Sequence, residues 1–452
     1  MLTKTEDLEQ LAETCLATAK AIKEHLAANG KPQMTFDQNG PPNFPDDAPP
    51  NIQYARLTLR EAAQRLADLV TGPEESVGFY PYQVNLDLCA YRYALKFNIA
   101  PAVPLNDSIS YADLAAKCKV DAGQLKQVLR QLMMTHFFHE PTPGMVAHTA
   151  ASKHLTHGGA RSWMQYSTTD TLGSAFHYLD AIEKWGHGSQ EHDQCGLQIH
   201  YGTDKSMYEY YEENEEVRTN FSDLLTYAST MAAVSNTFIA AGYDWASLGE
   251  VTIVDVAGSR GHSSVEIARS NPKAKIIVQD LPKIIDRARN PKTCVIPREL
   301  QPQITFMAHN FWDEQPVSAD VYFLRLIMHD WSDKYCIKIL RPLVKAMKPG
   351  GRIIIMDEIL PPVGGAPQPI ERFMRAQDLH MAVLTNAKER DHEQWQYLIH
   401  ATDPRLIIKS MTLPPGSAMA LIEVVLAEET NGDVDDKMKE IQPQLEPVSG
   451  VA

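Results

Sequence analysis

The chain of 452 residues contains few cysteines, and they are not arranged as a disulfide framework or a zinc site. No two of them form a CxxC pair, and the six are scattered: Cys15, Cys89, Cys118, Cys195, Cys294 and Cys336. This usage fits a reducing compartment. The N-terminal sequence MLTKTEDLEQ is polar and acidic, which is not typical of a secretory signal. We therefore expect a cytoplasmic protein.

Positive charge and long apolar runs are also scarce. The chain has 42 Lys and Arg against 57 Asp and Glu, a net charge of −15. Most of such a surface would repel a nucleic acid, so we expect no nucleic-acid partner. No run approaches the length of about 18 apolar residues that a membrane span needs, so we expect no membrane segment. The apolar content of 44% and the charged content of 22% are those of a globular protein with two or three domains.

Residues 1–75 are predicted to form helices and a proline-rich arm. Apolar side chains at helical spacing predict one helix over residues 5–29 and a second over about 58–70. Between them, residues 31–51 combine prolines with polar residues, which predicts an extended linker and not a packed element. At the other end, residues 430–452 are polar and acidic and are predicted to form a disordered tail.

Residues 76–165 are predicted to form a winged-helix-like domain. Two short helices joined by a turn with Asp121 as N-cap precede a β-hairpin over residues 137–147. The pattern is typical of DNA-binding modules, but the second helix offers only Lys126 and Arg130 as basic side chains. We therefore favour a structural or dimerisation role over DNA binding.

From residue 251 onward, strand and helix patterns alternate, which predicts an α/β fold with a doubly wound, Rossmann-like, largely parallel sheet. The last two predicted strands are separated only by a Pro-Pro-Gly-Ser turn, so we expect them to pair antiparallel as a C-terminal edge hairpin. The predicted strands cover residues 251–256, 276–280, 304–308, 319–327, 352–357, 405–410 and 419–427.

The turn after the first of these strands has fewer glycines than a dinucleotide-binding fingerprint. It reads AGSRG, with Gly258 and Gly261 where the fingerprint has three glycines. A helix follows, and the next strand ends at Asp280. Free N–H groups at a helix N-terminus and an acid about 20 residues further on are typical of a site for an adenosine-containing cofactor. We expect Asp280 to accept ribose hydroxyls, and Asp255 to order the turn or contact the cofactor.

A second group of polar residues follows the strand that ends near Met328. His329 and Trp331 are expected in the crevice at the carboxyl end of the sheet, where ligands of open α/β sheets bind. The adjoining strand leads to Asp357. A histidine beside an acid suits a general base whose ring the acid orients. A structural histidine at a strand end is the alternative interpretation.

Taken together, these segments resemble a known family. The sequences VDVAGSRGHSSVEIA and VQDLP, followed by HDWSDKYCIKIL, KPGGRIIIMDEILP and NAKERD, look like the S-adenosylmethionine-dependent O-methyltransferases of the plant caffeate/flavonoid type, closest to the fungal secondary-metabolism branch. The resemblance covers about residues 80–428. It implies that residues 76–165 serve homodimerisation and that residues 166–429 form the S-adenosylmethionine-binding catalytic domain.

The resemblance also implies which residues bind the cofactor. Asp255, Gly258 and Gly261 match the glycine-rich turn, and Asp280 matches the ribose-binding acid. Asn310 and Phe311 match a pair near the adenine. Arg325 lies four residues before the histidine, where plant members often carry lysine. The chain departs from the family at Ala257, which replaces a usual glycine. We expect this exchange to be tolerated on the condition that the φ angle of Ala257 is negative.

For catalysis, the resemblance implies that His329 is the base and that Asp357 and Glu389 are the acids that flank it. Asp357 is one carbon shorter than the glutamate common in the family, which reduces its reach to His329. A neutral histidine is a base of suitable strength for a phenol, whose pKa is about 10. The mechanism needs neither a metal nor a covalent intermediate. The predicted function is O-methylation of an aromatic or polyketide-type secondary metabolite.

An alternative function stays open at this point. Some fungal relatives keep the fold and the cofactor but catalyse pericyclic reactions or dehydrations, in which the sulfonium acts only as a fixed positive charge. In those relatives the base histidine tends to be replaced by another basic residue, so the presence of His329 favours methyl transfer.

The small-molecule substrate is expected to contact a set of apolar side chains and one acid, although plain core packing is an equal alternative for each of them. These candidates are Phe176, Met328, Trp331, Met374, Asp378 and Met381. The N-terminal helices and the proline-rich arm are expected to contribute to a homodimer interface.

Overall fold

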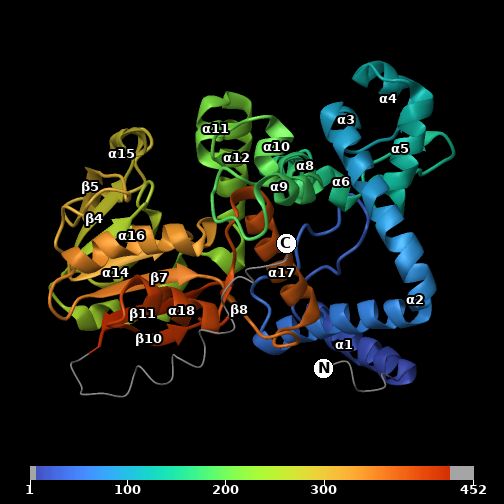
Figure 1. Cartoon of the computed structure of the whole chain (residues 1–452). Coiled ribbons are helices and arrows are strands. Elements are labelled where there is room, and N and C mark those ends of the chain that lie inside the picture. The colour runs from blue at the N-terminus through green and yellow to red at the C-terminus, as the bar shows by residue number, and fades with distance from the viewer. Residues whose placement is uncertain (1–6, 428–452) are drawn as a thin grey trace. The chain divides into compact units, whose positions relative to one another are not determined.

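The structure is a computed structural model that describes residues 7–427 (Figure 1). The chain forms two units, neither of them continuous in sequence. Unit 1 consists of Met1–Phe176, Tyr208–Met231 and Pro361–Ala376, and unit 2 of His177–Met207, Ala232–Leu360 and Gln377–Ala452. The predicted acidic tail lies outside the described residues. Within residues 7–427, no helix combines the length and the apolar character needed to cross a membrane.

Unit 1 begins with two long helices, α1 (Leu8–Ala28) and α2 (Pro50–Lys96), which pack against each other. Helix α2 is interrupted at Gly72, where φ is 72° and ψ is 169°, and Pro73 follows directly. Proline cannot donate to the preceding turn, so a break at this pair is expected. The helix starts before and ends well after the range predicted for it.

The proline-rich segment between these helices is packed, so the prediction of an unpacked linker is wrong. Phe44 and Ala48 are buried together with Ile52, and Ile22 of α1 packs against them. Phe36 stacks on the ring of His136 with a centroid distance of 3.9 Å. The prolines do extend the backbone, but the apolar residues between them find partners that are distant in sequence.

The region predicted to be winged-helix-like begins with the end of α2 and continues through α3 (Ile99–Ala102), α4 (Tyr111–Cys118) and α5 (Ala122–Met134). Asp121 caps α5 by accepting a hydrogen bond from the N–H of Gln124 at 2.8 Å. Strand β2 (Met145–Val146) pairs antiparallel with β1 (Ile109–Ser110). Within the predicted hairpin over 137–147, the described pairing is one bridge, His139 to Ala147. Phe138 has a φ of 62°, which ends the extended backbone there.

The remaining helices of the first half are short. Helix α7 packs against α12 in unit 1. The elements are α6 (Ala150–His154), α7 (Gly158–Tyr166), the π-helix η1 (Ser167–Thr171), α8 (Leu172–Phe176), α9 (Tyr178–Trp185), α10 (Gly196–Tyr201), α11 (Met207–Glu213), α12 (Glu215–Ala228), the 3₁₀ turn η2 (Ala232–Val234), α13 (Thr237–Gly242) and the 3₁₀ turn η3 (Trp245–Leu248).

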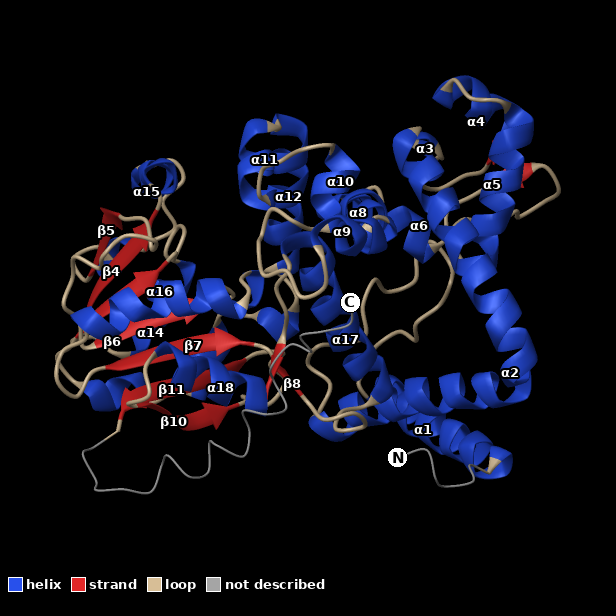
Figure 2. Ribbon diagram, in the orientation of Figure 1, coloured by secondary structure: helices blue, strands red, loops and turns tan. Residues whose placement is uncertain are grey.

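Unit 2 is built on a seven-stranded sheet in the order β10-β11-β7-β6-β3-β4-β5, which confirms the predicted α/β class. Figure 2 shows β7, β11 and β10 side by side, and β4 and β5 at the opposite side of the sheet. Strands β3 to β7 are parallel, and β11 is antiparallel to both β7 and β10. The strands are β3 (Thr252–Val256), β4 (Lys275–Asp280), β5 (Ile304–Ala308), β6 (Val321–Arg325), β7 (Arg352–Asp357), β10 (Leu406–Thr412) and β11 (Ala420–Leu426).

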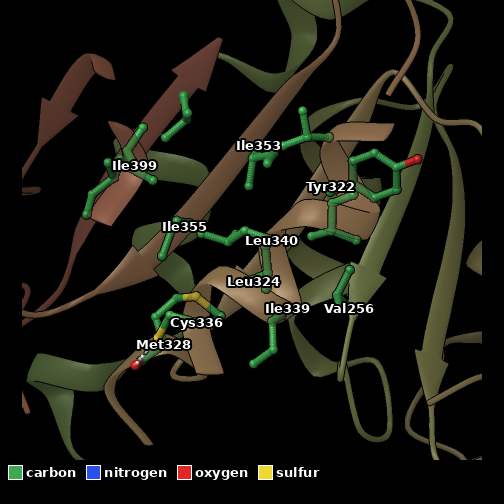
Figure 3. Close-up of a cluster of buried hydrophobic side chains, with 14 of the residues drawn as sticks. Val256, Tyr322, Leu324, Met328, Cys336, Ile339, Leu340, Ile353, Ile355 and Ile399 are labelled. Carbon is green, nitrogen blue, oxygen red and sulfur yellow. Dashed lines mark hydrogen bonds between the residues drawn. The ribbon is translucent and has the colours of Figure 1, made fainter. Parts of the chain in front are cut away.

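Both faces of this sheet are buried, because successive side chains of a strand point to opposite faces. On one face, Ile353 and Ile355 of β7 pack with Leu340 and Ile399 (Figure 3). On the other face, Ile354 of the same strand joins a separate apolar cluster. Burying each such side chain stabilises the fold by about 1.5–3 kcal/mol. Continuous apolar strands are therefore expected here.

The helices and small elements that accompany the sheet follow the alternation expected from the sequence. They are α14 (His262–Ser270), α15 (Pro282–Arg289), the 3₁₀ turns η4 (Arg298–Leu300) and η5 (Met328–Asp330), α16 (Asp333–Ala346), β8 (Ile359–Leu360), α17 (Gln368–Thr385), β9 (Arg390–Asp391) and α18 (His392–Thr402). Strands β8 and β9 pair parallel with each other, outside the main sheet.

Candidate active site

Four charged side chains mark the carboxyl ends of four neighbouring strands. In the order of the sheet they are Asp357 on β7, Arg325 on β6, Asp255 on β3 and Asp280 on β4. Consecutive strands run from β3 to one side and from β6 to the other, so the direction of winding changes between them. Ligands of open α/β sheets bind at such a point. The structure therefore brings together the acids that the sequence placed at separate strand ends.

Asp255 is buried beneath the glycine-containing turn. Its Oδ2 accepts a hydrogen bond from the hydroxyl of Ser264 at 2.6 Å. A Cβ atom on Gly258 would lie 2.5 Å from the Asp255 carboxyl carbon, so only glycine fits at that position. Burial raises the pKa of Asp255 to about 7. Of the two roles expected for Asp255, these contacts are those of an acid that orders the turn.

The turn itself is strained at Ala257, whose φ is +55°. The condition under which alanine was expected to replace glycine freely, a negative φ, is not met. A left-handed backbone costs a residue with a Cβ roughly 1–2 kcal/mol. Ser259 shares this conformation with a φ of 51°, and Gly261 has a φ of 85°. The turn thus keeps its shape with two non-glycine residues in the left-handed region.

Asp280 is tied to the same turn by its carboxylate. Oδ2 accepts the N–H of Ser259 at 2.8 Å, and Oδ1 accepts the N–H of Leu281 at 2.7 Å. Burial raises the pKa of Asp280 above its ordinary value. Each oxygen retains a second lone pair. Asp280 can therefore hold the turn and still accept a ribose hydroxyl.

Asn310 and Phe311 follow β5 and lead into an aromatic cluster. The side-chain oxygen of Asn310 accepts the N–H of Trp312 at 3.2 Å. The ring of Trp312 lies edge-on to Phe311 and to Trp331, with centroid distances of 4.7 and 4.8 Å. Tyr335 completes the cluster at 5.9 Å from Trp331. Phe311 and Trp331 were expected at the site from the sequence. Trp312, which directly follows Phe311, and Tyr335 were not.

Arg325 lies between the acids of the adjoining strands. Its Nη2 donates to the carbonyl oxygen of Val234 at 2.6 Å, and its Nε is buried without a hydrogen-bond partner among residues 7–427. Burial lowers the pKa of Arg325, while the charges of Asp357 and Asp255 raise it. A buried cation with a donor to spare can serve an anionic or polar ligand group.

His329 lies in η5, the element that follows β6 in the chain, and is held by Glu389. The Nδ1 atom of the ring is 2.9 Å from Oε1 of Glu389, and Nε2 is 3.6 Å from Oδ1 of Asp330. Glu389 is itself positioned by Asp378, whose Oδ1 accepts the N–H of Glu389 at 3.0 Å. The structure therefore brings His329 and Glu389 into direct contact, as the sequence analysis expected.

Asp357 is close to His329 but supports its loop instead of its ring. Oδ2 of Asp357 accepts the N–H of Met328 at 3.0 Å, and Oδ1 is buried without a partner among the described residues. Burial raises the pKa of Asp357 to about 7. In this position Asp357 orients the residue before His329 and adds negative charge near the ring.

The charges around His329 favour its protonated form. Burial by itself lowers the pKa of the ring, but the carboxylates of Asp330, Glu389 and Asp357 outweigh burial and raise the pKa to about 10. The adjacent Glu358 has its pKa raised to about 8 by burial and by Glu389. These charges favour the imidazolium form of the ring near neutral pH, whereas a neutral base was expected from the sequence.

Arg390, which the sequence analysis missed, fixes the loop that carries His329. Its guanidinium donates to the carbonyl oxygens of Met328 at 2.9 Å and Trp331 at 2.8 Å. It also forms an ion pair with Asp333 at 2.8 Å, and Lys388 pairs with the same carboxylate at 2.7 Å. Arg390 is next to Glu389 in the sequence, so its position beside a catalytic candidate was a usable signal.

The six residues expected to contact substrate fall in both units. Met328, Trp331, Asp378 and Met381 belong to unit 2, and Met328 and Met381 are buried there. Phe176 and Met374 belong to unit 1, where the side chain of Phe176 is exposed. Asp378, the acid among them, contacts the backbone of Glu389. Substrate contact by these residues stays a prediction.

Comparison with known proteins places this site in context. A family model for O-methyltransferase domains matches residues 182–403. The O-methyltransferase VdtC of Byssochlamys spectabilis is 35% identical over 431 residues, which cover 93% of this chain and 98% of VdtC.

Two solved structures are similar in fold. OxaC in complex with SAH and oxaline has a TM-score of 0.72 at 20% identity, covering 93% of this chain and 98% of OxaC. A structure described as a pericyclic reaction enzyme has a TM-score of 0.67 at 19% identity, covering 92% of this chain and all of that one.

Proposed function

The chain belongs to the O-methyltransferase family and uses S-adenosylmethionine, and on that premise we propose that it methylates a hydroxyl group of an aromatic or polyketide-type secondary metabolite, with His329 as general base. The observation that carries the proposal is the contact between Nδ1 of His329 and Glu389 at 2.9 Å. It leaves Nε2 as the ring nitrogen that can take up the proton of the acceptor hydroxyl.

The residues at the carboxyl edge of the sheet fit the cofactor on two observations. Both oxygens of Asp280 retain acceptor capacity, and Nε of Arg325 is buried without a partner among the described residues. We assign the ribose hydroxyls to Asp280 and the adenine to the surroundings of Asn310 and Phe311. The turn with Gly258 and Gly261 would let the backbone approach the cofactor closely.

The protonation state of His329 determines when it can act as a base. S-adenosylmethionine supplies an electrophilic methyl group on a positively charged sulfur. A positive charge near an imidazolium lowers its pKa, which opposes the effect of Asp330, Glu389 and Asp357. After proton transfer, the same three carboxylates stabilise the imidazolium that forms. The three acids therefore stabilise the state of His329 that follows proton transfer, and not the neutral state that precedes it.

A second candidate function rests on the same protonation state. An imidazolium near neutral pH is a hydrogen-bond donor and a fixed cation, which suits a pericyclic reaction or a dehydration that needs a polarised carbonyl. A similar fold occurs in a structure described as a pericyclic reaction enzyme. Methyl transfer remains the first proposal, because relatives of higher identity over nearly the whole chain are named O-methyltransferases.

We propose the following organisation of the chain for this function. Residues 1–75 form N-terminal helices and an arm, residues 76–165 a winged-helix-like dimerisation domain, residues 166–429 the catalytic domain and residues 430–452 a tail. A homodimer is supported by apolar side chains that α2 leaves exposed, including Val77, Phe79 and Tyr82. The proposed location is the cytoplasm, on the strength of the cysteine usage.

The test of the proposed function is one assay with two readouts. The protein would be incubated with S-adenosylmethionine and a panel of polyhydroxylated aromatics and polyketides, and mass spectrometry would follow products and S-adenosylhomocysteine. A product in which one methyl group has replaced one hydrogen, with an equal amount of S-adenosylhomocysteine, supports methyl transfer. An isomerised or dehydrated product, formed only with the cofactor present but without S-adenosylhomocysteine, overturns it in favour of the second candidate.

A further inference from the structure

Residues 189–195 form a strap of irregular structure within unit 2, between α9 and α10. The chain turns into this strap through two glycines with positive φ, Gly186 at 89° and Gly188 at 71°. Inside it, the hydroxyl of Ser189 donates to Oε1 of Gln194 at 2.7 Å. The strap ends where Cys195 donates its N–H to Oε1 of Gln198 at 2.8 Å. These hydrogen bonds fix both ends of the strap.

One side of the strap is bonded to the start of α16, close to His329. The hydroxyl of Ser332 donates to the carbonyl oxygen of Gln190 at 2.8 Å, and the N–H of Lys334 donates to Oε1 of Gln190 at 2.9 Å. The N-terminal N–H groups of a helix need external acceptors. Ser332 occupies the N-cap position without capping its own helix, so the side chain of Gln190 acts as the cap instead.

The other side of the strap is bonded to the turn that carries Glu389. Nδ2 of Asn386 donates to the carbonyl oxygens of Glu191 at 2.8 Å and Gln194 at 2.9 Å. Asn386 has a φ of 51° and ends α17, and the next N–H, from Ala387, returns to Met381. Asparagine tolerates this left-handed position, so Asn386 can both end the helix and donate hydrogen bonds to the strap.

The middle of the strap contacts the aromatic cluster of the site. The ring of His192 lies edge-on to Tyr335 at 4.8 Å and to Trp331 at 5.5 Å. The hydroxyl of Tyr335 donates to Oε2 of Glu191 at 2.7 Å. Each residue from Gln190 to His192 thus has at least one contact with the segment that follows His329.

We propose that Gln190 and Asn386 are positioning residues for the reaction. Through the strap they hold the loop of His329 and the turn of Glu389 in a fixed position relative to each other. Arg390 links these two segments directly, and the strap links them again through different atoms. The catalytic role of these two residues rests on the proposed function. The relative position of the two segments, however, depends only on residues of this chain.

The test measures the contact between His329 and Glu389 through the pKa of His329, and it needs no acceptor substrate. The variants are Asn386→Gly, which keeps the left-handed backbone and loses the carboxamide, and Gln190→Ala, which loses the cap. The readout is the pKa of His329 in ¹⁵N-histidine spectra, assigned by comparison with His329→Gln. We expect both variants to lower this pKa by about one unit or more, because Glu389 no longer stays in contact with Nδ1.

Two matched variants separate positioning from a general loss of stability. Gln190→Glu keeps an oxygen that can cap the helix and should retain the pKa of His329. Asn98→Gly removes another left-handed asparagine, in unit 1, where its side chain accepts from Arg161. It should leave the pKa of His329 unchanged even where the melting temperature falls.

Binding of S-adenosylhomocysteine, measured by calorimetry, completes the experiment. We expect its affinity to change less than about threefold in Asn386→Gly, since no strap residue is assigned to the cofactor. A pKa of His329 that stays at the wild-type value in both Asn386→Gly and Gln190→Ala overturns the proposal. Failure of the wild-type protein to bind S-adenosylhomocysteine would instead contradict the proposed function, and the spectra would still decide the positioning role.

Discussion

Glu389 holds His329 through one carboxylate oxygen only: Oε1 lies 2.9 Å from Nδ1 of the ring, and Oε2 is buried without a hydrogen-bond partner among the described residues. A buried oxygen without a partner destabilises the fold by about 1–3 kcal/mol. A carboxylate oxygen without a partner therefore lies buried near the ring at some expense in stability. Asp330, this contact with Glu389, and Asp357 together raise the proton affinity of His329.

Glu389→Gln should lower the pKa of His329, because the amide retains an acceptor oxygen for Nδ1 but removes the charge. We expect methyl transfer to fall by about 10²-fold, within the range for general acid–base groups. Histidine spectra and single-turnover rates measure the two effects. Glu393→Gln is the control, since it makes the same exchange at an exposed acid of α18. Wild-type rates in Glu389→Gln would contradict the assignment of Glu389.

The rate of methyl transfer should rise with pH on the alkaline side of neutrality. Asp330, Glu389 and Asp357 raise the pKa of His329 to about 10, so the neutral base becomes available only as the pH approaches that value. Asp330→Asn removes one of these charges and should move the rising limb to lower pH. The measurement is kcat/KM against pH, which reports on the free enzyme. An unshifted limb would mean that another group controls the profile.

The same group makes stability depend on pH with a defined sign. The pKa of His329 is raised in the folded protein, so the contribution to the free energy of unfolding is fully present below the ordinary pKa of about 6.5. It is lost as the pH rises toward about 10. The difference in unfolding free energy between wild type and His329→Gln, measured by urea titration, should therefore shrink across this interval. A difference that grows with pH would contradict the raised pKa.

Asp280→Ala should weaken binding of S-adenosylhomocysteine by a few kcal/mol, because both the ribose acceptor and the bond to the Ser259 N–H are lost. Calorimetry measures the affinity. Asp286→Ala changes an exposed acid of α15 and serves as the control. Equal affinity in the two variants would remove Asp280 from the cofactor site.

Ala257→Gly should stabilise the protein by about 0.5–1 kcal/mol. Relief of the left-handed strain at a φ of +55° exceeds the extra chain entropy that glycine loses on folding. Thermal or urea unfolding measures the effect, with Ala246→Gly in η3 as a variant that should only destabilise. A loss of stability in Ala257→Gly would show that the neighbouring contacts of the methyl group outweigh the strain.

Val77→Glu should shift the protein from dimer to monomer, because a charge would be placed among the exposed apolar residues of α2. Sedimentation velocity measures the mass. Val363→Glu is the matched control, since Val363 is exposed to a similar extent, 82% against 79% for Val77. A wild-type monomer, or a variant that remains dimeric, would contradict the proposed interface.

The sequence could predict the sheet because each strand has its own local pattern. The runs around Ile253, Ile277 and Ile354 are apolar on both faces, and the acids that follow them reach one edge by topology alone. Local pattern could also indicate His329, which lies four residues after the end of β6 at Arg325. These features depend on spacing within a few tens of residues.

The parts that could not be predicted depend on contacts between distant positions. Gln190 and Lys334 are 144 residues apart, and nothing in the sequence near Gln190 indicates a helix cap. The protonation of His329 depends on charges from three separate segments. The left-handed φ of Ala257 follows from the bonds of the turn to Asp280, while its side chain favours the opposite sign. The packing of Phe44 likewise depends on Ile22 of α1 and Ile52 of α2, which lie outside the proline-rich segment.

Gly258 and the acid beneath it restrict each other's evolution. Any side chain at position 258 would overlap the Asp255 carboxyl group, so substitutions there can be accepted only after position 255 has become smaller. Such a change would in turn leave the hydroxyl of Ser264 without its acceptor. Mutations at these three positions should therefore show strong epistasis, and a library that varies them singly would find almost no functional variants.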